Sequence, residues 1–283
     1  MIVVTGASGK TGHAVVRALA ARGAAVRAFV RRPEDAPLLA ARGAQSIVSG
    51  DLRHPADLAR AFAGVEAVYH ICPNVHPDEF AIGQGVIAAA RAAGVDRLIY
   101  HSVLHPQTEA MPHHWQKLRV EAALFESGLD YAILQPAPYM ENTLPAAVRD
   151  GVFTAPYPLE TRLSLVALSD VAEAAARFLI EPGHSHATYE LAGTQPLSLV
   201  DVAIQVSTAL GHGVRAVEVP ISAWEARALA AGLGEYQRST LKAMFAYYAA
   251  YGLAGNPNVL TWLLGRPPTS IVDFVRRHAT GLE

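Results

Sequence analysis

Gly6-Ala7-Ser8-Gly9-Lys10-Thr11-Gly12 follows directly on the apolar run Met1-Ile2-Val3-Val4-Thr5. The run has no polar face, which is typical of a strand buried in a parallel sheet. A helical pattern begins at residue 13, directly after the last glycine. A strand, a glycine turn and a helix in this order place a diphosphate on the free N–H groups of a helix N-terminus. The spacing G-x-x-G-x-x-G therefore predicts that the seven loop residues bind a dinucleotide, and the alternative is an ordinary glycine-rich turn.

The composition allows an ordinary enzyme. The 283 residues can form one large domain, or one domain and a small lobe, and 51% of them are apolar. A formal net charge of −2 gives no support for a nucleic-acid surface. The single cysteine, Cys72, excludes an internal disulfide, and no apolar stretch approaches the ~20 residues that span a bilayer. We expect a cytoplasmic protein whose partners include neither nucleic acid nor membrane.

Strand and helix patterns alternate through the first half of the chain. Strands are expected at residues 1–5, 25–30, 45–49, 67–71, 97–101 and 131–135, and helices at 11–22, 55–62, 79–93 and 113–127. Glycines stand just past such segments, where helix C-caps belong. Repeated strand–helix units predict an α/β fold of Rossmann type, with a doubly wound parallel sheet and ligands beyond the carboxyl ends of its strands.

The alternation loosens after about residue 150, where several prolines interrupt it. Strand patterns remain at 188–191 and 214–219, among helical patterns near 169–180, 198–210, 221–231 and 234–251. We expect an NAD(P)-binding Rossmann domain over 1–150 and a small, mostly helical C-terminal lobe over 151–283. Segments such as 164–191 are expected to return to the Rossmann domain. The lobe would cap the cofactor and shape a substrate cleft.

The end of the second expected strand distinguishes the two nicotinamide dinucleotides. Enzymes that prefer NAD place an acidic residue there, which accepts from the ribose 2′-hydroxyl. In this chain Arg31 and Arg32 follow the strand, and the first acid is Glu34. Paired guanidiniums suit a 2′-phosphate, because arginine binds phosphate through a bidentate fork. The sequence predicts NADP(H) as the cofactor, and the alternative is two solvated arginines on a turn.

Three further strand ends supply candidate cofactor contacts. Asp51 and Leu52 follow the third strand, where they suit an adenine amino group and ring, although Asp51 alternatively caps a loop or helix. Cys72 and Pro73 end the fourth strand, beside the expected ribose. Cys72 is interpreted as a buried apolar residue because no basic partner stands beside it in sequence. Pro136 ends the sixth strand, at the expected nicotinamide end of the groove.

These motifs together resemble those of the NmrA-like family, an atypical branch of the short-chain dehydrogenase/reductases. The resemblance rests on the glycine loop, on V-R-A-F-V-R-R-P, on G-D-L, and on residues 128–136 with 139–142. It continues in residues 168–174, 189–193 and 265–268, and so covers nearly the whole chain. The family includes NADPH-dependent reductases of quinones and triphenylmethane dyes. It also includes redox-sensing regulators that bind the dinucleotide without turnover.

The resemblance also implies roles for the helix after the fifth strand. The superfamily carries Tyr-x-x-x-Lys there, where the tyrosine protonates the substrate and the lysine holds the nicotinamide ribose. This chain has His113 and Lys117 at those positions. Lys117 is predicted as a cofactor ligand and catalytic residue. His113 is either a proton donor, with a pKa that the nearby lysine lowers, or a helix-start histidine facing solvent.

Substrate contacts are expected from Ser102, at the end of the fifth strand, and from Tyr139 and Asn142, after the sixth. Ser102 alternatively caps a backbone turn. The aromatic run 245–251 cannot lie on one helix face, so it serves packing, a flat conjugated substrate or a partner subunit, and a homodimer stays open. Four histidines cluster near the fifth strand: His101, His105, His113 and His114. No ligand spacing completes a metal site among them, and none is expected.

The sequence therefore predicts an NADPH-dependent oxidoreductase that moves hydride from nicotinamide C4 to a conjugated small molecule such as a quinone, enone or dye. The protein would contribute orientation and exclusion of water more than acid–base chemistry, because water can protonate the product. A dinucleotide-sensing regulator without turnover is the second hypothesis, favoured by the missing tyrosine. Sugar-nucleotide epimerase chemistry is weaker, because it needs that tyrosine.

Overall fold

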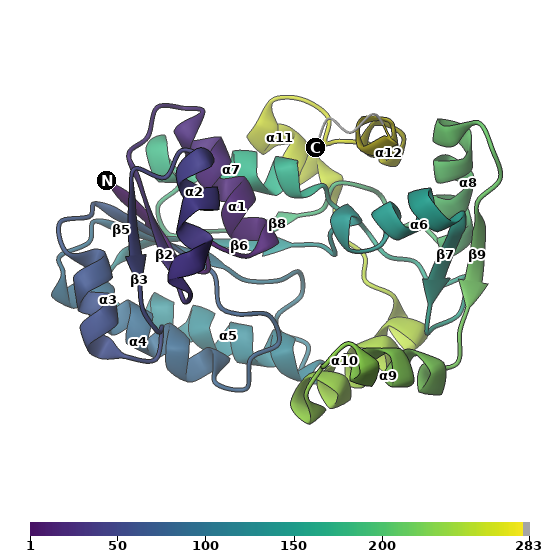
Figure 1. Cartoon of the computed structure of the whole chain (residues 1–283), viewed down its shortest axis with the longest axis horizontal. Coiled ribbons are helices and arrows are strands. Elements are labelled where there is room, and N and C mark those ends of the chain that lie inside the picture. The colour runs from purple at the N-terminus through teal and green to yellow at the C-terminus, as the bar shows by residue number, and fades with distance from the viewer. Residues whose placement is uncertain (280–283) are drawn as a thin grey trace. The chain divides into compact units, whose positions relative to one another are not determined.

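The structure, a computed structural model, describes residues 1–279, which are drawn in colour in Figure 1. They divide into two compact units. Unit 1 comprises Met1–Gln107, His113–Gln135 and Val171–Tyr189. Unit 2 comprises Thr108–Pro112, Pro136–Asp170 and the chain from Glu190 onward.

A seven-stranded sheet, in the order β3-β2-β1-β4-β5-β6-β8, organises unit 1. The strands are β1 (Ile2–Val4), β2 (Val26–Val30), β3 (Ser46–Ser49), β4 (Ala67–His70), β5 (Arg97–His101), β6 (Asp130–Pro136) and β8 (Ala187–Leu191). Every neighbouring pair from β3 to β6 is parallel. The strand order reverses between β1 and β4, which is the switch point where a doubly wound sheet binds its ligand.

Helices cover both faces of this sheet (Figure 1). One face carries α1 (Lys10–Ala20), α2 (Ala36–Ala41) and α7 (Leu168–Ile180), and the other carries α3 (Pro55–Phe62), α4 (Glu79–Ala92) and α5 (Pro112–Phe125). Apolar side chains of α3, α4 and α5 join those of the strands in one buried cluster, which includes Val68, Leu98 and Phe62. Because the central strands are buried on both faces, they appear in the sequence as short apolar runs.

Unit 2 contains a parallel pair of strands, β7 (Val152–Ala155) and β9 (Arg215–Glu218). Its helices are α6 (Leu144–Asp150), α8 (Leu199–Leu210), α9 (Ile221–Ala230), α10 (Glu235–Tyr251), α11 (Pro257–Leu264) and α12 (Ile271–Ala279), and η2 (Met140–Asn142) is a 3-10 turn. The buried Asp170 accepts from Arg266 Nη2 at 2.8 Å and from the Thr269 amide at 2.6 Å. These bonds tie the start of α7 to the segment before α12.

The fold class predicted from the sequence is confirmed. The strands expected from residue 1 to residue 135 lie within two residues of β1 to β6, and the four expected helices of that half correspond to α1, α3, α4 and α5. The glycines that follow these four helices, Gly23, Gly64, Gly94 and Gly128, adopt positive φ, as C-caps do, and so does Gly43 after α2. The prediction omitted α2, α6, α11, α12 and β7. Among the described residues, no helix combines the length and the apolar character needed to cross a membrane.

Candidate cofactor site

The glycine loop connects β1 to α1 at the carboxyl edge of the sheet, beside the switch point. Gly6 has a φ of 57°, and a Cβ there would stand 2.8 Å from the Ile71 carbonyl oxygen. A Cβ at Gly12 would stand 2.4 Å from the Gly6 carbonyl oxygen. Only glycine fits these two positions, because the loop folds tightly onto its own backbone.

The start of α1 is suited to an anion. Lys10 and Thr11 open the helix, and Gly9 at the N-cap brings no side chain that could accept from the first-turn amides. These amides point away from the helix and carry its positive end charge, so a pyrophosphate is a favourable partner. Ala7, between Gly6 and Ser8, is completely buried and places the loop against the sheet.

The two arginines after β2 have different surroundings. Arg31 is exposed, and within residues 1–279 it makes no hydrogen bond or ion pair. Arg32 donates from Nη2 and Nε to the Asp35 carboxylate, at 3.0 and 3.4 Å. Asp35 also accepts from the Ser8 hydroxyl, and the Arg32 bond, with smaller help from Ser8, holds the pKa of Asp35 below its usual range. The structure thus joins Ser8 to Arg32 through an acid that the sequence analysis did not single out.

The candidate adenine contacts follow β3. Arg53 binds the Asp51 carboxylate through Nη2 at 2.6 Å and Nε at 3.0 Å, and these bonds hold the pKa of Asp51 well below its usual range. Asp51 is therefore ionised and keeps lone pairs that can accept from an amino group. Leu52 is 9% exposed and belongs to the buried cluster. The adenine role of both residues stays a prediction.

Cys72 and Pro73 follow β4. Cys72 is buried, as the sequence interpretation held, and Pro73 is exposed. Burial, with a smaller contribution from Glu79, raises the pKa of the Cys72 thiol. A protonated thiol is a poor nucleophile, so any contact with a cofactor here would be through packing or backbone.

Lys117 lies in α5 and reaches the carboxyl end of β5. Its Nζ donates to Glu79 Oε1 at 2.9 Å and to the His101 carbonyl oxygen at 3.3 Å. The Tyr100 hydroxyl donates to the same Glu79 oxygen at 2.9 Å. Glu79 is only 2% exposed, so these two donors offset the cost of burying its charge. Glu79 was not predicted, because nothing in the sequence pairs it with a residue 38 positions later.

His113 stands at the start of the same helix but does not face solvent freely. It is half-buried, its Nδ1 is buried without a hydrogen-bond partner, and its ring centre lies 4.5 Å from that of His114. Burial first, then His114 and Lys117, lowers the pKa of His113 to about 3. The ring is neutral at neutral pH, as expected, and is a weak acid. Its role as proton donor stays a prediction.

Ser102, after β5, and Glu121, in α5, form a second buried polar group. The Ser102 hydroxyl donates to Glu121, which also accepts from Gln135 Nε2 at 3.0 Å through each of its oxygens. Burial raises the pKa of Glu121. The predicted substrate residues Tyr139 and Asn142 lie in unit 2, Tyr139 just before η2 and Asn142 at its end, and Pro136 is the buried last residue of β6. Their contacts with cofactor or substrate stay predictions.

The histidine cluster is tied into the protein. His101 Nδ1 lies 2.6 Å from the Tyr69 hydroxyl, and His114 Nδ1 lies 3.2 Å from the His105 carbonyl oxygen. Burial lowers the pKa of His101 to about 3 and that of His114 to about 4. In the part of the chain that the structure describes, no group of three or more His, Cys, Asp or Glu side chains is placed to hold a metal ion.

The aromatic run in α10 divides between two environments. Tyr248 is 6% exposed and its ring centre lies 6.0 Å from that of Tyr157, whereas Tyr251 is 76% exposed. Phe245 packs against Trp224, with ring centres 4.8 Å apart. The run thus supplies packing on one side of the helix and one exposed ring, Tyr251, on another, as its sequence spacing predicted.

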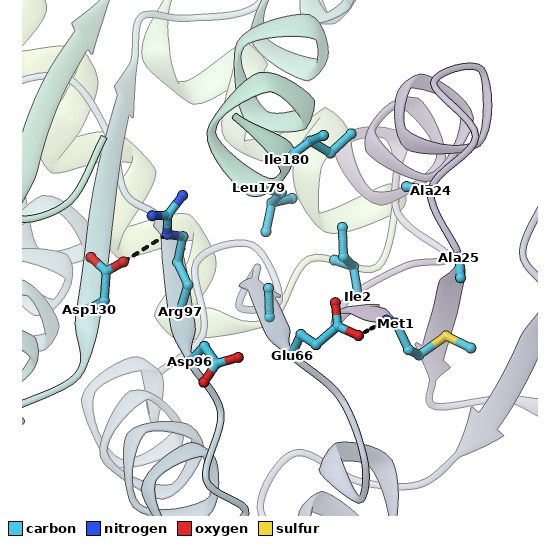
Figure 2. A pocket seen from close by; sticks show the side chains of 11 residues that line it. Met1, Ile2, Ala24, Ala25, Glu66, Asp96, Arg97, Asp130, Leu179 and Ile180 are labelled. Atoms are coloured by element: carbon cyan, nitrogen blue, oxygen red, sulfur yellow. Dashed lines mark hydrogen bonds and ion pairs between the residues drawn. The ribbon is translucent and has the colours of Figure 1, made fainter. Parts of the chain in front are cut away.

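A pocket of about 390 Å³ lies at the opposite, amino-terminal edge of the sheet (Figure 2). Two pairs of its charged groups are engaged with each other. Arg97 Nε lies 2.9 Å from Asp130 Oδ2, and the terminal amine lies 3.0 Å from Glu66 Oε1. Because α/β sheets bind ligands at the carboxyl edge, and every candidate residue of unit 1 lies there, this pocket is not the cofactor site.

Comparison with known proteins matches residues 1–273 to the NmrA-like family. The chain is 31% identical to the NAD(P)H azoreductase of Xenophilus azovorans, over 99% of this chain and 98% of that protein. Its fold is similar to that of the NADPH-dependent quinone oxidoreductase of Escherichia coli solved with NADPH, with a TM-score of 0.83, 30% identity and coverage of 99% and 100%. The triphenylmethane reductase of Citrobacter sp. solved with NADP(H) gives a TM-score of 0.84, 26% identity and the same coverage.

Proposed function

Since the chain belongs to the NmrA-like family, we propose that it is an NADPH-dependent oxidoreductase that reduces a conjugated small molecule such as a quinone, an enone or a dye. The observation that carries the proposal is the cofactor edge of unit 1, where the glycine loop, the start of α1 and Arg31 and Arg32 provide anion-binding groups in one place. The azoreductase and the quinone and dye reductases that resemble this chain over its whole length support the reaction class.

In this proposal each part of the edge holds one part of the cofactor. The residues from Gly6 to Gly12 bind the pyrophosphate, and Arg31 and Arg32 bind the 2′-phosphate. Lys117 donates to the nicotinamide ribose, while Glu79 and the His101 carbonyl keep its ammonium in place. Bound NADPH supplies the hydride.

The protein's own contribution is orientation rather than proton transfer. His113 is neutral because burial lowers its pKa to about 3, so it donates a proton poorly at neutral pH. Quinones and cationic dyes accept hydride readily, and water can protonate the product. Holding the acceptor against the nicotinamide and excluding bulk water are then the main sources of rate.

The test is the loss of NADPH absorbance with a panel of quinones, enones, azo dyes and triphenylmethane dyes. We expect turnover with at least one acceptor class, and we expect Gly12→Ala to abolish it because the loop cannot form. Tight NADPH binding without turnover of any acceptor would contradict the proposal and favour the second candidate, a dinucleotide-sensing regulator. The observation that favours this candidate is His113, which stands where the superfamily has its catalytic tyrosine.

We also propose that a small molecule, and not nucleic acid, is the partner, that the chain works in the cytoplasm, and that it pairs as a homodimer. The net charge of −2 supports the first point. Tyr251 and Trp262 support pairing, because they are 76% and 75% exposed and large aromatic side chains are enriched at subunit interfaces. Light scattering during size-exclusion chromatography gives the mass, and a monomer at micromolar concentration would contradict the dimer.

A further inference from the structure

The turn after β2 contains Asp35, whose carboxylate contacts both the glycine loop and Arg32. These are the two groups that we expect to bind the phosphates of the cofactor. Asp35 ends the 3-10 turn η1 (Pro33–Asp35). Its carboxylate accepts from Arg32 Nη2 and Nε, at 3.0 and 3.4 Å, and from the Ser8 hydroxyl of the glycine loop. The Asp35 side chain is only 16% exposed, whereas that of Arg32 is 59% exposed. Asp35 therefore lies between the loop and the arginine, not out in solvent.

This contact uses the donors that an incoming phosphate needs. Arginine binds an oxyanion through two parallel N–H groups, and in Arg32 the Nε and Nη2 pair is already directed at Asp35. Glu34 lies farther off, with its Oε1 3.9 Å from Arg32 Nε. The turn from Arg31 to Asp35 thus holds two guanidiniums and two carboxylates, so the carboxylates offset part of the attraction of the guanidiniums for an anion.

We propose that Asp35 is a specificity-determining residue that competes with the cofactor 2′-phosphate for Arg32 and Ser8, and so lets the chain use NADH as well as NADPH. This inference rests on the proposed function, because it concerns the cofactor of that reaction. With NADH, the ribose 2′-hydroxyl donates to the Asp35 carboxylate, which is the contact that NAD-preferring Rossmann sites make with an acid near the end of the second strand. With NADPH, Arg32 turns from Asp35 to the phosphate, and Arg31, which makes no hydrogen bond or ion pair within residues 1–279, joins it.

The test measures binding of NADPH, NADH, ADP and adenosine 2′,5′-bisphosphate to the full chain by calorimetry, without an acceptor. Asp35→Asn removes the charge and keeps the shape, on a turn where it cannot endanger the core. We expect this variant to bind NADPH and the bisphosphate about two- to fivefold more tightly, because an ion pair with one exposed partner is modest in strength. NADH should bind more weakly by a similar factor, and ADP should bind as it does to the wild type.

Glu34→Gln is the matched control, because it removes the same charge from a neighbouring residue that only approaches Arg32. We expect Glu34→Gln to change the ratio of NADPH affinity to NADH affinity by less than half of the change that Asp35→Asn causes. If Asp35→Asn weakens NADPH binding, Asp35 positions Arg32 for the phosphate and the proposal is overturned, as it is by an unchanged affinity ratio. Absence of turnover would defeat the proposed function alone, whereas a wild-type chain that binds neither dinucleotide would defeat both.

Discussion

Lys117 and Glu79 form a buried ion pair: Lys117 compensates the charge of Glu79, and Glu79 positions the Lys117 ammonium. Glu79 receives one bond from the Lys117 ammonium and one from the Tyr100 hydroxyl, each at 2.9 Å. A carboxylate taken out of water needs such partners, because its desolvation costs several kcal/mol. The same bonds hold the ammonium beside the His101 carbonyl oxygen, at the end of β5. A residue of α4 thus fixes the cation that we place at the nicotinamide ribose.

Replacing Lys117 with alanine tests this arrangement. We expect Lys117→Ala to weaken NADPH binding about tenfold or more, since it removes a charged hydrogen-bond donor. It should also lower the free energy of unfolding by about 3 kcal/mol, because Glu79 is left buried and unpaired. Calorimetry with NADPH and urea unfolding measure the two effects.

Two controls separate binding from stability. Adenosine 2′,5′-bisphosphate lacks the nicotinamide riboside, so Lys117→Ala should bind it as the wild type does. The double variant Lys117→Ala/Glu79→Gln removes the unpaired charge and should recover much of the lost stability while NADPH binding stays weak. An NADPH affinity equal to that of the wild type would assign Lys117 a structural role only.

For His113, in contrast to Lys117, we predict no effect on the pH profile, because its ring is already neutral. Burial, His114 and Lys117 lower the pKa of His113 to about 3, far below the range in which enzymes use histidine as an acid. We expect kcat/KM for a quinone to show no inflection due to His113 between about pH 5.5 and 8. His113→Gln should keep the profile of the wild type. An acid limb that disappears in this variant would identify His113 as the proton donor.

At the scale of elements, the glycine loop can form only if Gly12, its last residue, packs directly against the backbone of Gly6 and Ala7, its first two residues. A Cβ at Gly12 would stand 2.4 Å from the Gly6 carbonyl oxygen and 2.5 Å from Ala7 Cα, and neither atom can move without the strand. We expect Gly12→Ala to destabilise the chain by about 1–3 kcal/mol, as overpacking does, and to abolish NADPH binding. Thermal unfolding and calorimetry measure this.

Gly9→Ala is the matched control, since its Cβ would lie 3.4 Å from the Gly6 carbonyl oxygen, close to ordinary contact. Its melting temperature should stay near that of the wild type. A Gly12→Ala variant with wild-type stability and affinity would show that the loop is less constrained than its backbone contacts indicate.

The start of α7 and the segment before α12 depend on one carboxylate. Asp170 is completely buried and accepts from Arg266 Nη2, the Thr269 amide and the Thr269 hydroxyl, at 2.8, 2.6 and 3.1 Å. Asp170→Asn leaves part of these donors without an acceptor, and we expect a loss of about 3 kcal/mol in urea unfolding. Asp273→Asn, on the exposed side of α12, should cost less than about 1 kcal/mol. If both variants lost the same free energy of unfolding, Asp170 would not be the residue that holds these two segments together.

Strands β1, β2, β4, β5 and β6 could be predicted because they are mostly buried, so that each appears as an apolar run such as Ala67–His70. Strand β3 lies at the edge of the sheet and is only half-buried, but it keeps the apolar pair Ile47-Val48. Strand β7 was missed because its four residues alternate between buried and exposed side chains among prolines. Helix α2 was missed because its six residues include a proline and only Leu39 is buried. Elements with a continuous apolar run could thus be located from the sequence, and elements without one could not.

The same limit applies to the site. Arg31, Asp51 and Cys72 could be located because each follows a strand whose end lies at the carboxyl edge. The pairs that define their chemistry could not be predicted, because Lys117 meets Glu79, and Asp35 meets Ser8, only after separate elements pack. Sequence spacing predicts neighbours within an element and is silent on contacts between elements.

At the scale of the whole molecule, folding keeps four histidines neutral. Burial is the first cause in each case, and Lys117 adds to it, so that the pKa falls from 6.5 to about 3 for His70, His101 and His113 and to about 4 for His114. His70 Nδ1 lies 2.9 Å from Thr5 Oγ1, so its neutral ring also supports the strand that leads into the glycine loop.

As the pH falls, this chain should therefore unfold at a higher pH than its modest net charge suggests. Each of these histidines titrates near its ordinary value in the unfolded chain and far lower in the folded one, so between about pH 6.5 and 4 the unfolded state binds more protons. The stabilisation is complete above pH 6.5 and is lost as the pH falls, by up to about 1.4 kcal/mol per histidine for each pH unit. Urea unfolding from about pH 7.5 to 5 should show this slope. His101→Asn keeps an acceptor for the Tyr69 hydroxyl and should reduce the slope by about one proton. A free energy of unfolding that stays constant over this range would mean that these rings are hydrated in the folded protein.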